Sequence, residues 1–114
     1  MKIEGGNNIA IKIPKYKFEE TVAFYKDILG LPLKGTEANS VAFEFGGSTL
    51  WLDCMKNYAQ HDVWLELKSS RLDDTSQLFN KEKVPRRDEV EIHEHSAGFW
   101  ISDPAGTILR INPK

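Results

Sequence analysis

The sequence lacks several features that would assign it to a familiar class. Cys54 is the only cysteine in 114 residues, which excludes intrachain disulfides and fits a reducing compartment. No run approaches the roughly 18 apolar residues of a membrane span, and the first residues carry no apolar signal segment. The 15 basic and 17 acidic residues are interspersed, with no basic run that would indicate a nucleic-acid partner. We therefore expect a soluble, cytoplasmic protein without nucleic-acid or membrane partners.

Length and composition indicate one compact domain. A chain of 13.0 kDa with 40% hydrophobic residues can bury an adequate core without disulfides or metals as staples. We expect a single domain that covers residues 1–114.

Alternating apolar and polar residues predict short β-strands whose two faces differ. Successive side chains of a strand point to opposite faces, so each run buries its aliphatic set on one face. Trp51, Trp64 and Trp100 each stand between two apolar residues and are expected on the opposite face. If the runs share one sheet, that face forms an aromatic-lined cavity. The alternating runs are 41–45, 50–53, 62–67, 99–101 and 109–111.

The order of the predicted elements repeats once along the chain. In the first half a strand over 9–13 precedes a helix that ends at Gly30 and a hairpin that turns at Gly46 and Gly47. In the second half a strand over 62–68 precedes a helix that ends near 84–85, a polar strand over about 89–94 and a hairpin with a type I turn at 103–106. The pattern predicts two βαβββ modules, about 7–54 and 61–112. The apolar helix positions are Phe18, Val22, Tyr25 and Leu29 in the first half and Leu72, Leu78 and Phe79 in the second, where Ser69 and Ser70 are the expected N-caps.

Three segments resemble motifs of the vicinal oxygen chelate superfamily. FYKDILGLPL, which starts at Phe24, is similar to its first-helix signature, and DPAGTILRI, which starts at Asp103, is similar to its closing hairpin. GSTLWLDC between them is similar to a hairpin of fosfomycin-resistance proteins, one branch of the superfamily. The superfamily also includes glyoxalase I, extradiol dioxygenases and bleomycin-binding proteins. The resemblance covers roughly residues 8–112. It implies a single glyoxalase-like α+β domain whose two βαβββ modules form a half-barrel sheet around a cavity, and a homodimer.

The resemblance places the family's four metal-ligand positions on Asn8, Asp53, Asp62 and Arg110. Arginine stays protonated and has no lone pair to donate to a metal. We therefore expect no metal or other cofactor, with a divalent cation held by Asp53 and Asp62 as the minority alternative. His61 could replace Asp62 only after a one-residue slip, which would turn the tryptophan face of that strand toward the helix.

Two other features leave alternatives open. His93 and His95 lie two residues apart in the polar strand, where they either form a metal pair or occupy an exposed edge among glutamates. Asp53 and Arg110 occupy equivalent hairpin positions, so an ion pair between them could replace the metal. That pair is either a structural salt bridge or a site where Arg110 binds a ligand carboxylate or phosphate.

The leading functional interpretation is metal-independent binding of a small aromatic or cationic organic molecule in the tryptophan-lined cavity. The alternative is a metal-dependent lyase, isomerase or dioxygenase of the same superfamily, with Asp53, Asp62 or Glu66 as general base. A protein-interaction module that uses the aromatic face is a third possibility. The residues expected to line the cavity are Asn8, Lys12, Glu44, Trp51, Asp53, Asp62, Trp64, Glu66, Trp100 and Arg110.

Overall fold

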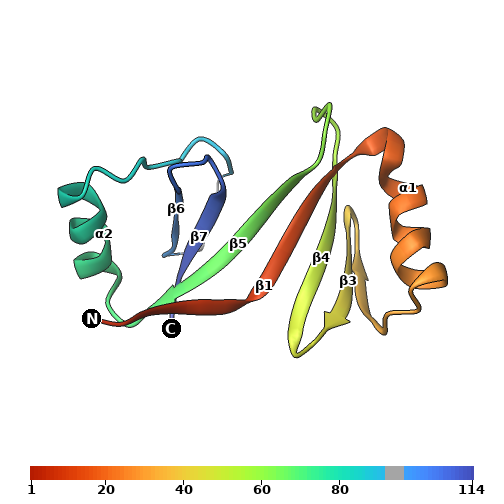
Figure 1. Ribbon diagram of the computed structural model, residues 1–114, viewed down its shortest axis with the longest axis horizontal. Coiled ribbons are helices and arrows are strands. Elements are labelled where there is room, and N and C mark those ends of the chain that lie inside the picture. Colours follow the sequence, from red (N-terminus) through yellow and green to blue (C-terminus); the bar gives the residue numbers. More distant parts are fainter. Residues whose placement is uncertain (92–96) are drawn as a thin grey trace. The chain divides into compact units, whose positions relative to one another are not determined.

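The computed structural model describes residues 1–91 and 97–114 (Figure 1). The described ranges hold seven strands and two α-helices, so the predicted α+β class is confirmed. The strands follow the hydrogen-bonded order β2-β3-β4-β1-β5-β7-β6. No helix within these ranges is both long and apolar enough to cross a membrane. The elements are β1 (Ile3–Pro14), α1 (Lys15–Ala23), η1 (Phe24–Ile28), β2 (Leu33–Glu37), β3 (Ser40–Phe45), β4 (Ser48–Met55), β5 (Asp62–Ser69), α2 (Leu72–Lys81), β6 (Phe99–Ser102) and β7 (Ile108–Pro113).

The chain divides into two compact units, and each is described by itself. The first unit is Asn7–Trp64, and the second combines Met1–Gly6 with Leu65–Lys114. Strands β1 and β5 each run from one unit into the other. The placement of one unit against the other, and with it the cavity predicted between the two modules, stays a prediction.

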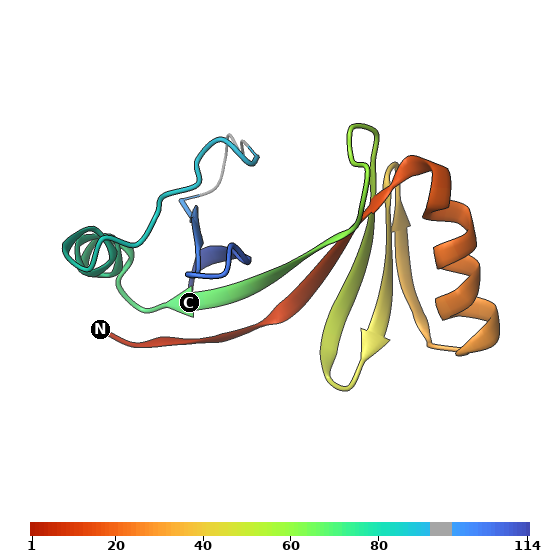
Figure 2. The ribbon, with the colours of Figure 1, turned by 45° about the horizontal axis from the view of Figure 1, so that its top comes forward.

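The first unit has the predicted order of strand, helix and three further strands. β3 and β4 form an antiparallel hairpin, and β4 pairs in parallel with β1. The hairpin turns at Gly46 and Gly47, whose φ angles are 56° and 87°. Two consecutive positive φ values suit a two-residue turn of type I′, which glycine adopts without steric cost. Figure 2 shows α1 lying along one face of these strands.

The first helix ends with a π-helical turn that the sequence pattern did not indicate. In η1, the amide of Leu29 bonds to the carbonyl of Phe24 at 3.0 Å, and Gly30 follows with a φ of 67°. The predicted end at Gly30 is therefore confirmed. Leu29 was expected on the buried face but is exposed, and Leu31 packs against the core instead. The π turn holds one residue more than an α turn, which rotates the later side chains away from the expected face.

The core of the first unit confirms the predicted alternation in β4 and only part of it in β3, where Ala42 is also buried and Phe45 is exposed. Val41, Phe43, Leu50 and Leu52 are buried together with Ile13 of β1. Trp51 lies between Leu50 and Leu52 and therefore points to the opposite face, where it is half-buried. The side chains that cover the core from the helical segment include Phe18, Val22 and Tyr25.

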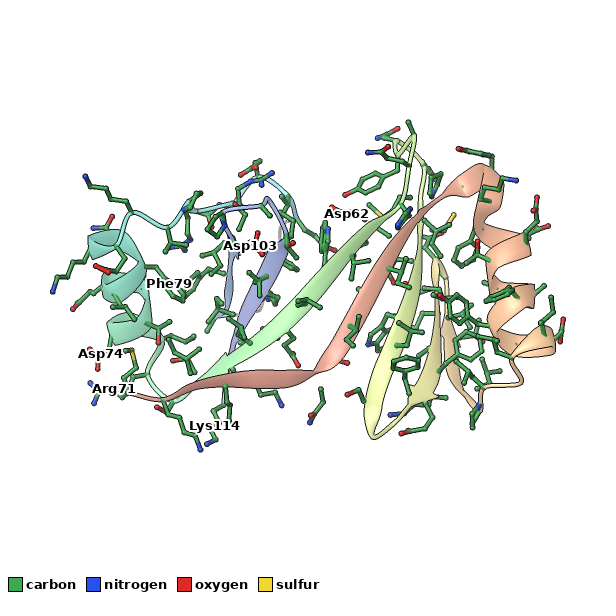
Figure 3. The ribbon with its side chains drawn as sticks, in the orientation of Figure 1. Asp62, Arg71, Asp74, Phe79, Asp103 and Lys114 are labelled. Atoms are coloured by element: carbon green, nitrogen blue, oxygen red, sulfur yellow. The ribbon has the colours of Figure 1, made fainter. Side chains whose placement is uncertain are left out.

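The second unit holds α2 and the β6–β7 hairpin. Phe99, Ile101 and Ile111 form its buried core, and Phe79 of α2 packs against them; Figure 3 shows Phe79 on the side of α2 nearest β6 and β7. The predicted turn is confirmed, because the amide of Gly106 bonds to the carbonyl of Asp103 at 3.0 Å. The Asp103 carboxylate also accepts two backbone N–H bonds, from residues 105 and 107.

Two details of the second unit differ from expectation. Residues 88–90 form a turn and a bend rather than the start of a polar strand, and the isolated bridge between Arg86 and Ile101 precedes them. Residue 91 also lies in no strand, and the remainder of that predicted polar strand, with His93 and His95, lies outside the described residues. The N-cap of α2 is Arg71 rather than a serine. The Ser69 hydroxyl bonds to Thr75 at 2.5 Å, and the Ser70 hydroxyl accepts the amide of Lys2 at 2.9 Å.

Strand β5 reverses the predicted pattern of burial. Trp64 is only 4% exposed, whereas its neighbours Val63 and Leu65 are 37% and 38% exposed. Trp64 is covered by Lys12, whose ammonium lies over its ring, while Val63 borders an open pocket beside α1. Burial at these positions depends on which side chains cover each face of the strand. Strand alternation alone does not specify this cover.

Candidate functional site

A buried ion pair lies on the tryptophan-bearing face of the first unit. Lys12 Nζ donates to Asp53 Oδ2 at 2.7 Å, and the two side chains are only 8% and 16% exposed. Ser40 Oγ donates to the other carboxylate oxygen at 2.6 Å. The strand register explains this cluster, because Lys12 of β1 and Ser40 of β3 both pair with Asp53 of β4. Both oxygens of Asp53 are therefore bonded within this unit.

The same lysine covers Trp64. Its Nζ lies 4.0 Å from the centroid of the Trp64 ring, a cation–π contact. Trp64 Nε1 donates to Asp62 Oδ2 at 2.9 Å, and Asp62 Oδ1 accepts the amide of Val63 at 3.0 Å. Figure 3 labels Asp62 at the start of β5. Lys12 thus links the buried carboxylate to an aromatic ring that is itself fixed by hydrogen bonding.

Trp51 is held in a similar way by the first strand. Its Nε1 donates to Asn8 Oδ1 at 2.8 Å. Glu44, also expected in the cavity, instead accepts the amide of Gly47 at 2.8 Å and pairs with Lys34 at 3.7 Å. The structure therefore brings Asn8 together with Trp51, and places Glu44 at the hairpin turn.

The second unit contains a related pair of arginine and tryptophan. The guanidinium carbon of Arg110 lies 4.7 Å from the centroid of the Trp100 ring. Arg110 Nε donates to Asn112 Oδ1 at 3.0 Å, and Asn112 Nδ2 donates to Glu66 Oε2 at 2.7 Å. Asn112 was not among the predicted residues, although its position two residues after Arg110 places it on the same strand face.

Burial lowers the pKa of Arg110, while the negative charges of Glu91 and Glu66 raise it. The guanidinium nevertheless stays protonated, because the pKa of arginine starts far above physiological pH. The predicted pair of Asp53 and Arg110 joins residues of the two units and stays a prediction. Within their own units, Asp53 bonds to Lys12 and Ser40, and Arg110 bonds to Asn112 and stacks on Trp100.

The four metal-ligand positions implied by the family resemblance do not fit a divalent metal. The side-chain oxygens of Asn8, Asp53 and Asp62 accept hydrogen bonds from this chain, and Asp53 already faces an ammonium group. Arg110 has no lone pair to donate. Within residues 1–91 and 97–114, no group of three or more histidine, cysteine, aspartate or glutamate side chains is arranged to hold a metal ion.

Comparison with known proteins finds a likeness in structure but none in sequence. No family model matches the sequence, and no curated protein matches it. A glyoxalase/bleomycin resistance protein/dioxygenase superfamily member from Vibrio splendidus 12B01 has a TM-score of 0.67 and 15% identity, over 93% of this chain and 97% of that chain. The Mn(II)-bound glyoxalase from Novosphingobium aromaticivorans has a TM-score of 0.71 and 15% identity, over 98% of this chain and 39% of that chain.

A third similar structure is a variant of homoprotocatechuate 2,3-dioxygenase from B. fuscum, with a TM-score of 0.63 and 15% identity over 99% of this chain and 33% of that chain. These likenesses extend over nearly the whole of this chain, and therefore over its α+β arrangement of a seven-stranded sheet and two helices. The chain shares its fold with these glyoxalase, bleomycin resistance protein and dioxygenase structures, and this is the fold that the resemblance in its sequence motifs implied. At this level of identity the likeness establishes the fold alone.

Proposed function

We propose that this protein binds a small aromatic or cationic organic molecule on its tryptophan-bearing face without a resident metal. The observation that carries the proposal is the arrangement in the first unit. Trp51 and Trp64 lie on the sheet face opposite the aliphatic core, and their indole N–H groups are fixed by Asn8 and Asp62. Trp64 is only 4% exposed and lies under Lys12, so the half-buried Trp51 offers the stacking surface. A ring held in place by a hydrogen bond loses little conformational entropy when a flat ligand stacks on it.

The metal-independent part of the proposal is supported by Lys12. Its ammonium supplies the positive charge beside Asp53 at 2.7 Å, so that carboxylate is neutralised from within the chain. Lys12 also occupies the cation position over Trp64. We therefore expect an aromatic ligand to bind better than an aliphatic cation, because the cation–π position at Trp64 is already filled.

Replacing Trp51 with leucine is expected to weaken binding of an aromatic ligand by about tenfold, the loss of one stacking contact of roughly 1 to 1.5 kcal/mol. Calorimetric titration with 2-naphthol, N-methylquinolinium and tetramethylammonium measures this effect and ranks the ligand classes. Phe45→Leu is the matched control, since Phe45 is an exposed aromatic residue of the same hairpin on the opposite face. Equal affinity in wild type and Trp51→Leu would contradict the proposal, as would an equal loss in both variants.

The homodimer implied by the resemblance is part of the same proposal, as is a cytoplasmic location. Light scattering of the purified protein tests the dimer. Enzymatic activity of the lyase, isomerase or dioxygenase kind stays an alternative that rests on the likeness in fold.

A further inference from the structure

We propose that the first unit carries a second binding site, on the helix side of the sheet, for an amphiphilic carboxylate with an aliphatic body. The site is a pocket of about 520 Å³ beside α1, within the range typical of small-molecule pockets. Lys12 and Trp64 point to one face of β1 and β5, so their strand neighbours Ile11, Ile13 and Val63, which line this pocket, point to the other. The pocket is therefore separate from the tryptophan face.

The floor of the pocket is apolar. Ile11 and Ile13 of β1 contribute to it together with Val63 of β5. Val63 is 37% exposed, although the alternation of its strand predicts a buried residue. Ile13 is already buried in the core, so an aliphatic ligand on this floor would mainly remove the exposed apolar surface of Val63 from water, which is the main favourable contribution in such a site.

A contact between the helix and the segment before β5 lies at the pocket. The hydroxyl of Tyr16 donates to the carbonyl of Ala59 at 3.1 Å, and both residues line the pocket. This hydrogen bond joins α1 to the loop that carries Gln60 and His61. The pocket is thus bounded by three parts of the chain: the helix, the loop and the sheet.

The polar groups at the pocket favour an anion. Lys17 and His61 line it, and none of the described residues that line it is acidic. The Lys17 ammonium has a weak competitor in Glu20, at 3.5 Å in an exposed pair, which a ligand carboxylate can displace because exposed pairs of this kind contribute little. The apolar body of the ligand would therefore lie on the floor of the pocket, with its carboxylate beside Lys17 and His61.

Titration with octanoate, 1-octanol and octylammonium tests the site, with calorimetry for affinity and amide chemical shifts for location. We expect octanoate to bind most tightly and octylammonium most weakly. We also expect shifts at residues 16–17 and 60–63, with the indole N–H signals of Trp51 and Trp64 unchanged. Because the probe is aliphatic and these signals report the other face, failure here is distinguishable from failure of the proposed function.

Val63→Asn and Leu65→Asn provide a matched pair for the floor. Both residues are aliphatic, lie two positions apart in β5 and are similarly exposed, but only Val63 lines the pocket. Val63→Asn is expected to weaken octanoate binding by about tenfold, and Leu65→Asn to leave it unchanged. An equal loss in both variants, or no binding to wild type, overturns the proposal.

Lys17→Gln tests the choice of a carboxylate, with Lys15→Gln as its control on the same helix. Because Lys17 is an exposed lysine, the loss of its ion pair should weaken octanoate binding by about two- to fivefold and leave octanol binding as it was. If octanoate and octanol bind alike, or if the two lysine variants behave alike, the anionic ligand class is wrong.

Discussion

Lys12→Met is expected to lower the free energy of unfolding by about 3 to 5 kcal/mol, the usual effect of removing one partner of a buried ion pair. Lys12 and Asp53 are 2.7 Å apart and largely buried, so the variant leaves an uncompensated carboxylate in a poorly solvated position. It also removes the ammonium from the face of Trp64. Urea denaturation followed by tryptophan fluorescence measures the change.

Lys34→Met is the matched control for this variant. Lys34 and Glu44 lie 3.7 Å apart with side chains 44% and 42% exposed, and an exposed pair contributes about 1 kcal/mol or less. The double variant Lys12→Met/Asp53→Asn should recover part of the lost stability, because the uncompensated charge is then gone. Equal effects of the two lysine variants would show that Lys12 and Asp53 do not form the buried pair described above.

Phe43→Ala is expected to destabilise the protein by about 3 to 5 kcal/mol, as large aromatic truncations in a packed core do. Phe43 has no exposed surface and contacts the ring of Tyr25, with centroids 6.3 Å apart. This variant tests which face of β3 is the core face, and therefore which face is left for the tryptophans. Thermal and urea unfolding both report the change.

Phe45→Ala serves as its comparison, since Phe45 is the same residue type, two positions along the same strand, and 46% exposed. We expect a loss below about 1 kcal/mol, because truncating an exposed side chain removes little buried surface and leaves no cavity. Similar losses at both positions would contradict the assignment of the core to residues at and around Phe43.

Local sequence patterns predicted much of the fold because their physical causes are local. Two glycines with positive φ specify the turn between β3 and β4. Asp103, with Gly106 three residues later, specifies the turn of the second hairpin. In the same way, alternation in β4 identified Leu50 and Leu52 as core.

The features that the sequence did not predict depend on contacts between distant segments. The pair of Lys12 and Asp53 requires the parallel register of β1 and β4, which no short motif encodes. The π-helical turn moved Leu29 out of the expected face, since its hydrogen bonding differs from that of an α-helix. The exposure of Val63 depends on the segments beside it, which include α1 and the loop before β5, and the periodicity of its own strand does not specify them.

The candidate site also combines features that the sequence predicted with contacts between distant segments that it did not predict. Sequence alternation put Trp51 and Trp64 on the face opposite the aliphatic residues, and Asn8 and Asp62 were named because of the family resemblance. The structure adds the contacts that join them, with each indole N–H bonded to one of these oxygens. It also places the Lys12 ammonium beside Asp53, a contact that the sequence reasoning did not name, while the pair of Asp53 with Arg110 stays a prediction.

Elemental analysis of metal content tests the central claim most directly. Protein purified without a metal-binding tag would be measured before and after incubation with Zn, Ni, Mn, Fe and Co salts, followed by removal of unbound ions. We expect no stoichiometric metal to be retained, because the Lys12 ammonium sits on Asp53 and Arg110 cannot act as a ligand. About one retained transition-metal ion per chain would contradict the proposal and indicate a metal-dependent activity.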